Sequence, residues 1–186
     1  MGTDNRKERT RQAILEAMGT CLETQGFNEI TTTHLAQTAG ISRSSFYTHY
    51  KDKYELIDSY QQGLFHKLEA IFDRYDGNRQ SSFLEIFELL YREKLLSALL
   101  THNGTQEIQN FLINKVRLLV ANDLAERLGK EDLSPLEKEY SSIYFSHAFF
   151  GIMQVWIKNG KQESPQYMTD FLIKMLPLSL FSTFTP

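Results

Sequence analysis

The stretch HLAQTAGISRSSFYTHYKDK, residues 34–53, is the most informative part of the chain, because it reads as two short helices joined by a tight turn. Threonines 31–33 offer capping hydroxyls before the first helix, and Gly40 ends it. Ser42 is the expected N-cap of the second helix, in which Phe46 should face inward. This spacing is typical of a helix-turn-helix, whose second helix enters the major groove of DNA.

The second helix also carries polar side chains that suit contact with DNA. The small serines let the backbone approach the groove, and Arg43 has the fork geometry to hydrogen-bond guanine twice. Phosphate contacts would fix orientation without reading sequence. The candidate contacts in this stretch are Arg43, Ser44, Ser45, Tyr47, His49 and Lys53. The alternative is that this run is accidental and the chain is a structural helical bundle without DNA binding.

Charge limits the kinds of DNA binding that are possible. The 186 residues carry a formal net charge of −3, which argues against non-specific coating of nucleic acid. Any DNA contact must therefore come from a local patch. Near the N-terminus, four cations face only two carboxylates, Asp4 and Glu8. These cations are Arg6, Lys7, Arg9 and Arg11.

The sequence predicts a cytoplasmic protein without a membrane partner. The N-terminus is polar and has no apolar signal core. The apolar segment 171–184 is interrupted by Lys174 and Pro177 and is too short to span a bilayer. The single cysteine, Cys21, fits a reducing compartment and a buried structural thiol.

Helical periodicity runs through the rest of the chain, which predicts an all-α fold. We expect helices over 9–25, from about 51 to a turn at 76–78, over 83–100, over 107–128, from a capping box at 134–137 to 159, and from 164 onward. No segment alternates with a strand period of two. We predict an N-terminal three-helix DNA-binding domain, 1–55, and a C-terminal helical bundle, 56–186, for dimerisation and effector sensing.

Residues 9–57 resemble the TetR family of bacterial transcriptional regulators. The resemblance is carried by AILEAMGTCLETQGFNEITTTHLAQTAGISRSSFYTHYKDKYELI, residues 13–57, where many positions match the family pattern at fixed offsets. It implies a homodimer that binds a palindromic double-stranded DNA operator, with repression the commoner outcome. By the resemblance, the operator contacts are Thr32, Thr33, Arg43, Ser44, Ser45, Tyr47, Thr48, His49 and Lys53, with Lys7 and Arg11 as further phosphate contacts.

The stretch AFFGIMQVWIKNGKQESPQYMTDFL, residues 148–172, resembles a subgroup of that family that includes regulators of dihydroxyacetone kinase operons in Gram-positive bacteria. The last two helices are apolar on more than one face, and a second subunit would bury them. Small residues at 148 and 151 would let a partner helix come close. The predicted dimer interface is Ala148, Gly151, Val155, Phe171, Leu172 and Met175.

The C-terminal part could sense either a small molecule or a protein. An aromatic set could line a ligand pocket, or could equally be core. This set is Phe87, Tyr91, Phe111, Tyr144, His147 and Trp156. In the alternative, the C-terminal domain senses a protein partner and the chain activates transcription. The five histidines lack metal-ligand spacing and no phosphate-binding loop occurs, so we expect no enzyme activity, no cofactor and no metal.

Overall fold

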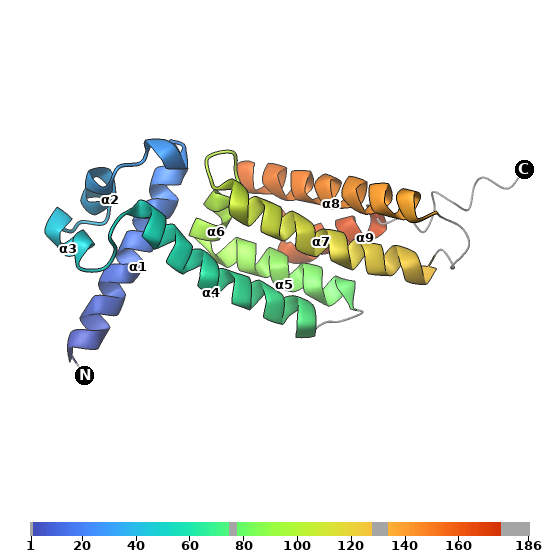
Figure 1. Cartoon of the computed structure of the whole chain (residues 1–186), viewed down its shortest axis with the longest axis horizontal. Helices are drawn as coiled ribbons and strands as arrows, with labels where there is room; N and C mark the ends of the chain where they lie inside the picture. Colours follow the sequence, from blue (N-terminus) through green and yellow to red (C-terminus); the bar gives the residue numbers. More distant parts are fainter. Residues whose placement is uncertain (1, 75–77, 128–133, 176–186) are drawn as a thin grey trace, which may run out of the picture. The chain divides into compact units, whose positions relative to one another are not determined.

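The computed structural model describes residues 2–74, 78–127 and 134–175, and every regular element within these ranges is a helix (Figure 1). The all-α prediction is therefore confirmed. The α-helices are α1 (Gly2–Leu22), α2 (Thr32–Thr38), α3 (Arg43–Tyr47), α4 (Lys53–Arg74), α5 (Arg79–Arg92), α6 (Lys94–Leu99), α7 (Gln106–Arg127), α8 (Pro135–Lys158) and α9 (Pro165–Met175). A short 3-10 helix, η1 (Phe27–Glu29), precedes α2.

The two short helices of the helix-turn-helix begin at the predicted caps. The Thr31 hydroxyl accepts a hydrogen bond from the His34 amide at 3.1 Å, and the Ser42 hydroxyl accepts one from the Ser45 amide at 3.1 Å. Each bond satisfies an amide that has no partner inside the helix. Gly40 lies between them with a φ of 66°, a left-handed conformation that glycine adopts without strain. The turn is therefore fixed by local chemistry.

The described residues divide into two compact units. The first comprises residues up to Ala70 together with Arg92–Gln109, and the second comprises Ile71–Tyr91 together with the residues from Asn110 onward. The predicted division of function between 1–55 and 56–186 stays a prediction.

Contacts distant in sequence hold the first unit together. The Asn103 side chain donates to the Leu22 carbonyl at 2.8 Å, and the Asn103 carbonyl accepts from the Phe27 amide at 2.8 Å. The Gln61 side chain donates to the Thr105 hydroxyl at 2.8 Å. The α6–α7 loop thus joins α1 and α4 in one unit. Its core consists of buried apolar side chains from α1, α2, α3, α4 and α6, among them Ile14, Met18, Leu22, Leu35, Phe46, Leu56 and Leu99.

The prediction of one helix over 83–100 is wrong, because the chain breaks at Glu93. Helix α5 ends at Arg92, and Glu93 has an extended backbone (φ −93°, ψ 96°) before α6 begins. Every residue from 95 to 100 is buried. Neither proline nor glycine marks the break, so packing of α6 rather than local propensity accounts for it.

Aromatic pairs form much of the core of the second unit. Phe83 packs edge-on against Phe149, with ring centres 5.5 Å apart. Helix α8 begins at the predicted capping box, in which Ser134 accepts from the Glu137 amide and Glu137 accepts from the Ser134 amide. The Ser164 hydroxyl accepts from the Tyr167 amide at the start of α9. Residue 128 and residues 76 and 77, where two predicted helices end, lie outside the described residues.

Candidate nucleic-acid interface

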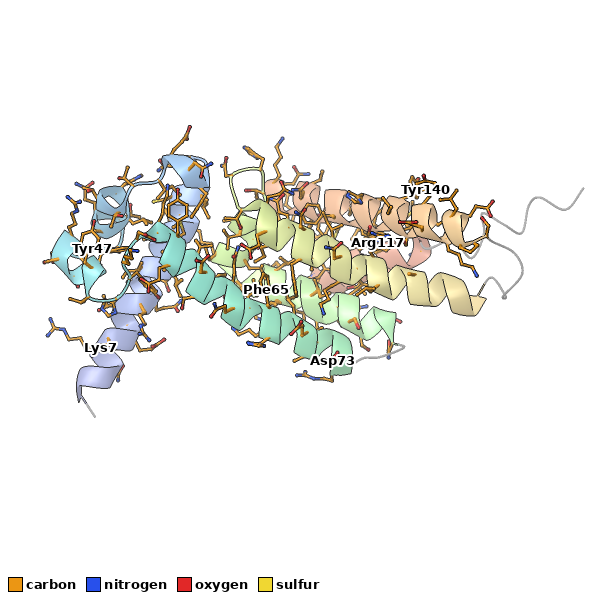
Figure 2. All side chains as sticks on the ribbon, in the orientation of Figure 1. Lys7, Tyr47, Phe65, Asp73, Arg117 and Tyr140 are labelled. Carbon is orange, nitrogen blue, oxygen red and sulfur yellow. The ribbon has the colours of Figure 1, made fainter. Side chains whose placement is uncertain are left out.

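Helix α3 exposes one polar face. Arg43, Ser44, Tyr47 and Thr48 are exposed, whereas Phe46 is fully buried beneath them. Tyr47, labelled beside α3 in Figure 2, is 47% exposed. The buried phenylalanine anchors a helix of only five residues, which leaves the opposite face free to meet a ligand.

Two side chains of this face are already arranged in the free protein. Arg43 Nη2 donates to the Tyr47 hydroxyl at 3.2 Å, and the guanidinium carbon lies 5.6 Å from the centre of the tyrosine ring. Hydrogen bonding and the cation–π contact act together here. The pair therefore holds a guanidinium fork on the outside of the helix.

The predicted threonine and serine contacts flank this pair. Thr33 is exposed and Thr32 half-buried in the first turn of α2, and Ser45 is half-buried in α3. The Ser44 hydroxyl lies 2.9 Å from that of Ser42, and the Thr48 hydroxyl donates to the Ser45 carbonyl at 2.7 Å. These hydroxyls keep lone pairs that can still accept hydrogen bonds.

A second group of cations comes from α1. Lys7 and Arg11 are both exposed, and both act electrostatically on His49, which follows α3. Partial burial lowers the pKa of His49, and the charges of Arg11 and then Lys7 lower it further. The sequence thus folds so that the N-terminal cations and His49 share one neighbourhood.

Lys53 has a different role from the predicted phosphate contact. Its ammonium is buried and donates to the carbonyls of Phe27 at 2.9 Å, Asn28 at 2.8 Å and Ile30 at 2.8 Å. An ammonium has three donors, and all three are used. Burial lowers the pKa of Lys53. The lysine side chain therefore ties the start of α4 to the turn before α2, and we remove it from the DNA-contact set.

The structure brings together only part of the predicted ligand pocket. Phe87 and Trp156 are buried with ring centres 5.2 Å apart, and Tyr91 stacks on Trp156 at 6.4 Å. Tyr144 is 67% exposed on α8, and His147 is exposed on the same helix. Phe111 on α7 is half-buried, and the Lys115 ammonium lies 5.5 Å from the centre of its ring. The role of these six residues as a pocket stays a prediction.

Most of the predicted dimer residues are exposed. Ala148 and Val155 on α8 and Phe171 and Met175 on α9 are exposed, and Gly151 is half-buried. Leu172 is fully buried within its own chain, so the prediction that it lies in the dimer interface is wrong. Its neighbour Phe171 points outward instead because successive residues of a helix lie about 100° apart.

The sequence interpretation did not assign Leu136, Tyr140 or Tyr167 to this surface, and it gave Tyr144 to the ligand pocket. Leu136, Tyr140 and Tyr144 are 57%, 63% and 67% exposed, and with Ala148, Gly151 and Val155 they recur every three or four residues along α8. Figure 2 shows Tyr140 on the outer side of that helix. On α9, Tyr167, Phe171 and Met175 repeat every four residues. We call these two rows the α8–α9 stripes; their spacing was the signal available in the sequence.

No group of three or more histidine, cysteine, aspartate or glutamate side chains in the described part of the chain could hold a metal ion. None of the described helices is both long and apolar enough to cross a membrane.

An N-capped helix-turn-helix joined to further helices defines the chain as a transcriptional regulator of the helix-turn-helix class, and comparison with known proteins narrows the class. Residues 14–60 match the family model described as "Bacterial regulatory proteins, tetR family", and residues 77–177 match that of a transcriptional regulator C-terminal region. The chain belongs to the TetR family of transcriptional regulators. Members of this family are DNA-binding transcription factors rather than enzymes.

One relative matches over nearly the whole chain. It is the HTH-type transcriptional regulator YxbF of Bacillus subtilis (strain 168), which is 25% identical over 185 residues. The match covers 96% of this chain but 47% of the relative, so the chain spans about half the length of the curated relative it matches.

Solved structures share the fold at low identity. FadR of Bacillus halodurans, a fatty acid degradation regulator, has a TM-score of 0.67 at 12% identity and covers 92% of this chain and 96% of its own. NalD of Pseudomonas aeruginosa, the secondary repressor of the MexAB-OprM efflux pump, has a TM-score of 0.65 at 21% identity over 91% and 96%. DhaS, a dihydroxyacetone kinase operon activator, has a TM-score of 0.56 at 19% identity over 90% and 93%. These likenesses support an N-terminal helix-turn-helix domain followed by a helical C-terminal domain.

Proposed function

We propose that the chain is a homodimeric repressor that binds a palindromic operator through α3. The observation that carries this proposal is the exposed face of α3, where Tyr47 holds Arg43 in the free protein. A guanidinium held in place loses less side-chain freedom on binding than a mobile one. Arg43 would contact a guanine edge in the major groove. The hydroxyl groups around it would contact phosphates and base edges.

Contacts from outside α3 would position the helix on the duplex. Thr32 and Thr33 lie at the N-terminus of α2, where helix amides also favour an anionic phosphate. Lys7, Arg11 and His49 would contact phosphates from the side of α1. Phosphate contacts carry no sequence information directly, but they set orientation and give binding its salt dependence.

The α8–α9 stripes support a homodimer. Large apolar side chains that are more than half exposed, such as Tyr144 and Val155, would be buried by the same stripes of a second copy. Tyrosine and methionine are enriched in such interfaces. A two-fold dimer presents two α3 helices to half-sites separated by about 34–36 Å for each DNA turn, which is the reason to expect a palindrome.

An effector would act in the C-terminal helices and shift the spacing of the two recognition helices. A ligand can shift this equilibrium only by its difference in affinity for the two states. We propose that a small molecule releases the repressor. Proteins of the same fold either repress or activate transcription, since NalD is described as a repressor and DhaS as an activator.

Selection of bound sequences from a random DNA library by the purified chain, at two salt concentrations, tests the proposal. We expect a palindrome whose half-sites contain guanine, and we expect the Arg43→Ala, Tyr47→Ala double variant to lose it while remaining dimeric. Recovery of no sequence preference would contradict the proposal. In a transcription assay on the recovered operator, the protein should lower transcript yield; a rise would indicate an activator instead.

A further inference from the structure

A groove of about 890 Å³ lies within the first unit and outside the α8–α9 stripes. No residue of α3 lines it, although Arg11 and His49, two of the proposed phosphate contacts, do. Its walls come from α1, α4 and the break between α5 and α6, and α1 and α4 cross at an angle beside it (Figure 1). Leu15, Leu64 and Leu95 give it an apolar portion. We call it the α1–α4 groove. Its volume falls in the range of sites that hold small molecules, roughly 300–1,000 Å³.

A glycine lies in the wall of the groove in the interior of a helix. Gly63 is exposed near the middle of α4, and a Cβ atom added there would have nothing within 4 Å among the atoms compared. A helix-interior glycine costs about 0.5–1 kcal/mol relative to alanine. No close approach of the chain to itself at this position requires glycine. The missing side chain instead keeps the groove wide.

A buried hydroxyl beside the same groove also costs stability. The Tyr60 hydroxyl is shielded from solvent and makes no hydrogen bond of normal geometry among the described residues, and the backbone of Leu96 is a polar group that acts on it. An unsatisfied buried polar group costs about 1–3 kcal/mol. Tyr60 and Gly63 lie on neighbouring positions of α4, three residues apart. A bound ligand would explain both the helix-interior glycine and the unsatisfied hydroxyl. Such a ligand would approach Gly63 and, after a small rotation of the ring, would accept a hydrogen bond from Tyr60.

Charge is distributed unevenly along the groove. Lys67, Arg92 and Lys94 lie near its apolar portion, and their acidic neighbours are Glu93, paired with Lys67 at 3.8 Å, and Glu23, paired with Lys94 at 3.0 Å. This end keeps an excess of one cation. The lining also carries three further carboxylates, Glu8, Glu16 and Glu55, together with Arg11 and the half-buried His49.

We propose that the α1–α4 groove binds a small amphipathic anion, with its apolar body against Leu15, Leu64 and Leu95 and its anionic head toward Lys67 and Arg92. The carboxylates farthest from these cations, Glu8 and Glu55, would repel the head and so favour one orientation of the ligand. Apolar contact provides most of the affinity, and the cations select the class of ligand. The residues proposed to contact the ligand are separate from the proposed operator contacts, so the site can exist whether or not the proposed function is correct.

Titration of the full chain with 8-anilinonaphthalene-1-sulfonate, an anionic amphiphile that fluoresces in apolar sites, tests this proposal. Gly63→Phe fills the groove, and a Lys67→Gln, Arg92→Gln double variant removes its cations. We expect each to weaken the dissociation constant of the dye at least tenfold. Gly63→Ala is the matched control for the first: its melting temperature should rise, and it should weaken dye binding less than Gly63→Phe does. Lys158→Gln, an exposed lysine on α8, is the control for charge.

Two measurements keep the outcome clear. Far-ultraviolet circular dichroism establishes that Gly63→Phe is folded, and if it is not, the double charge variant alone decides. Nuclear Overhauser effects from the dye to the methyl groups of Leu15 and Leu64 would support the site directly. The proposal is overturned if neither variant changes dye binding, or if Val155→Glu on the α8 stripe removes it instead. Operator binding is measured separately, so failure here leaves the proposed function standing.

Discussion

Arg43 Nη2 lies 3.2 Å from the Tyr47 hydroxyl, one helical turn further along α3, and its guanidinium carbon lies 5.6 Å from the centre of the Tyr47 ring. Both side chains are on the exposed face of α3, where solvent competes for every hydrogen bond. The contact is therefore modest in energy but restricts the directions that Arg43 can take. We therefore expect both side chains to contribute to operator binding.

Arg43→Ala should weaken binding to the recovered operator by about 5- to 150-fold, the loss of one bidentate base contact worth roughly 1–3 kcal/mol. Tyr47→Phe keeps the ring and removes the hydroxyl, so it should cost less, roughly 0.5–1.5 kcal/mol. Fluorescence anisotropy with operators in which each guanine is replaced in turn measures both effects. Lys158→Ala is the control. Equal loss on every operator would mean that Arg43 contacts phosphate rather than a base.

Lys53→Met should destabilise the first unit. It leaves the carbonyls of Phe27, Asn28 and Ile30 without their shared donor, which should lower the free energy of unfolding by about 2–3 kcal/mol in urea denaturation. Lys51→Met, at an exposed neighbouring lysine, should change it by less than about 0.5 kcal/mol.

The same variant also tests the corrected role of Lys53. Where Lys53→Met is still folded, the dependence of log K on log salt should match that of the parent. Removing one phosphate contact would reduce that slope by about 0.9, and such a change would restore Lys53 to the DNA-contact set.

The sequence was sufficient to predict the structure where local interactions determine it. Thr31, Ser42 and Ser134 cap helices through bonds to amides three residues away, so their positions could be read from a few letters. The helix-turn-helix followed from these caps, from Gly40 and from one buried anchor, Phe46. The all-α class followed from helical periodicity alone.

Long-range interactions could not be read in this way. The ammonium of Lys53 binds carbonyls 23 to 26 residues away in the sequence. The residue type alone does not show whether a lysine is exposed or buried. The helix break at Glu93 has neither proline nor glycine to mark it in the sequence. The burial of α6 determines where the break falls. The α1–α4 groove combines residues from three separate segments, and only Gly63 leaves a trace in the sequence.

Operator binding should strengthen as the pH falls through the titration of His49. Burial, then Arg11, then Lys7 lower the pKa of His49 in the free protein, so the ring is neutral near pH 7. A nearby phosphate favours the charged ring and raises its pKa in the complex, and the complex therefore takes up a proton. Affinity should rise as the pH falls from above the pKa of the complex to below that of the free protein, by at most tenfold per pH unit.

His49→Gln should remove this part of the pH dependence. Anisotropy titrations between about pH 5.5 and 8 at constant ionic strength, with the parent and the variant, measure the difference. Identical slopes for the two proteins would exclude His49 from the phosphate contacts.

Val155→Glu should dissociate the proposed dimer. The valine side chain is 56% exposed in one chain and would be buried against the partner, where an unpaired carboxylate costs several kcal/mol. Each 1.4 kcal/mol changes the dissociation constant tenfold, so sedimentation equilibrium should show dimerisation weakened by on the order of a hundredfold or more.

Leu118→Glu is the matched control, because Leu118 is 60% exposed on α7, outside the α8–α9 stripes. A monomeric Val155→Glu chain should also lose affinity for the full palindrome while it binds a single half-site as weakly as the parent does. If instead Val155→Glu remains dimeric and Leu118→Glu does not, the interface lies on α7 and the assignment to the stripes is wrong.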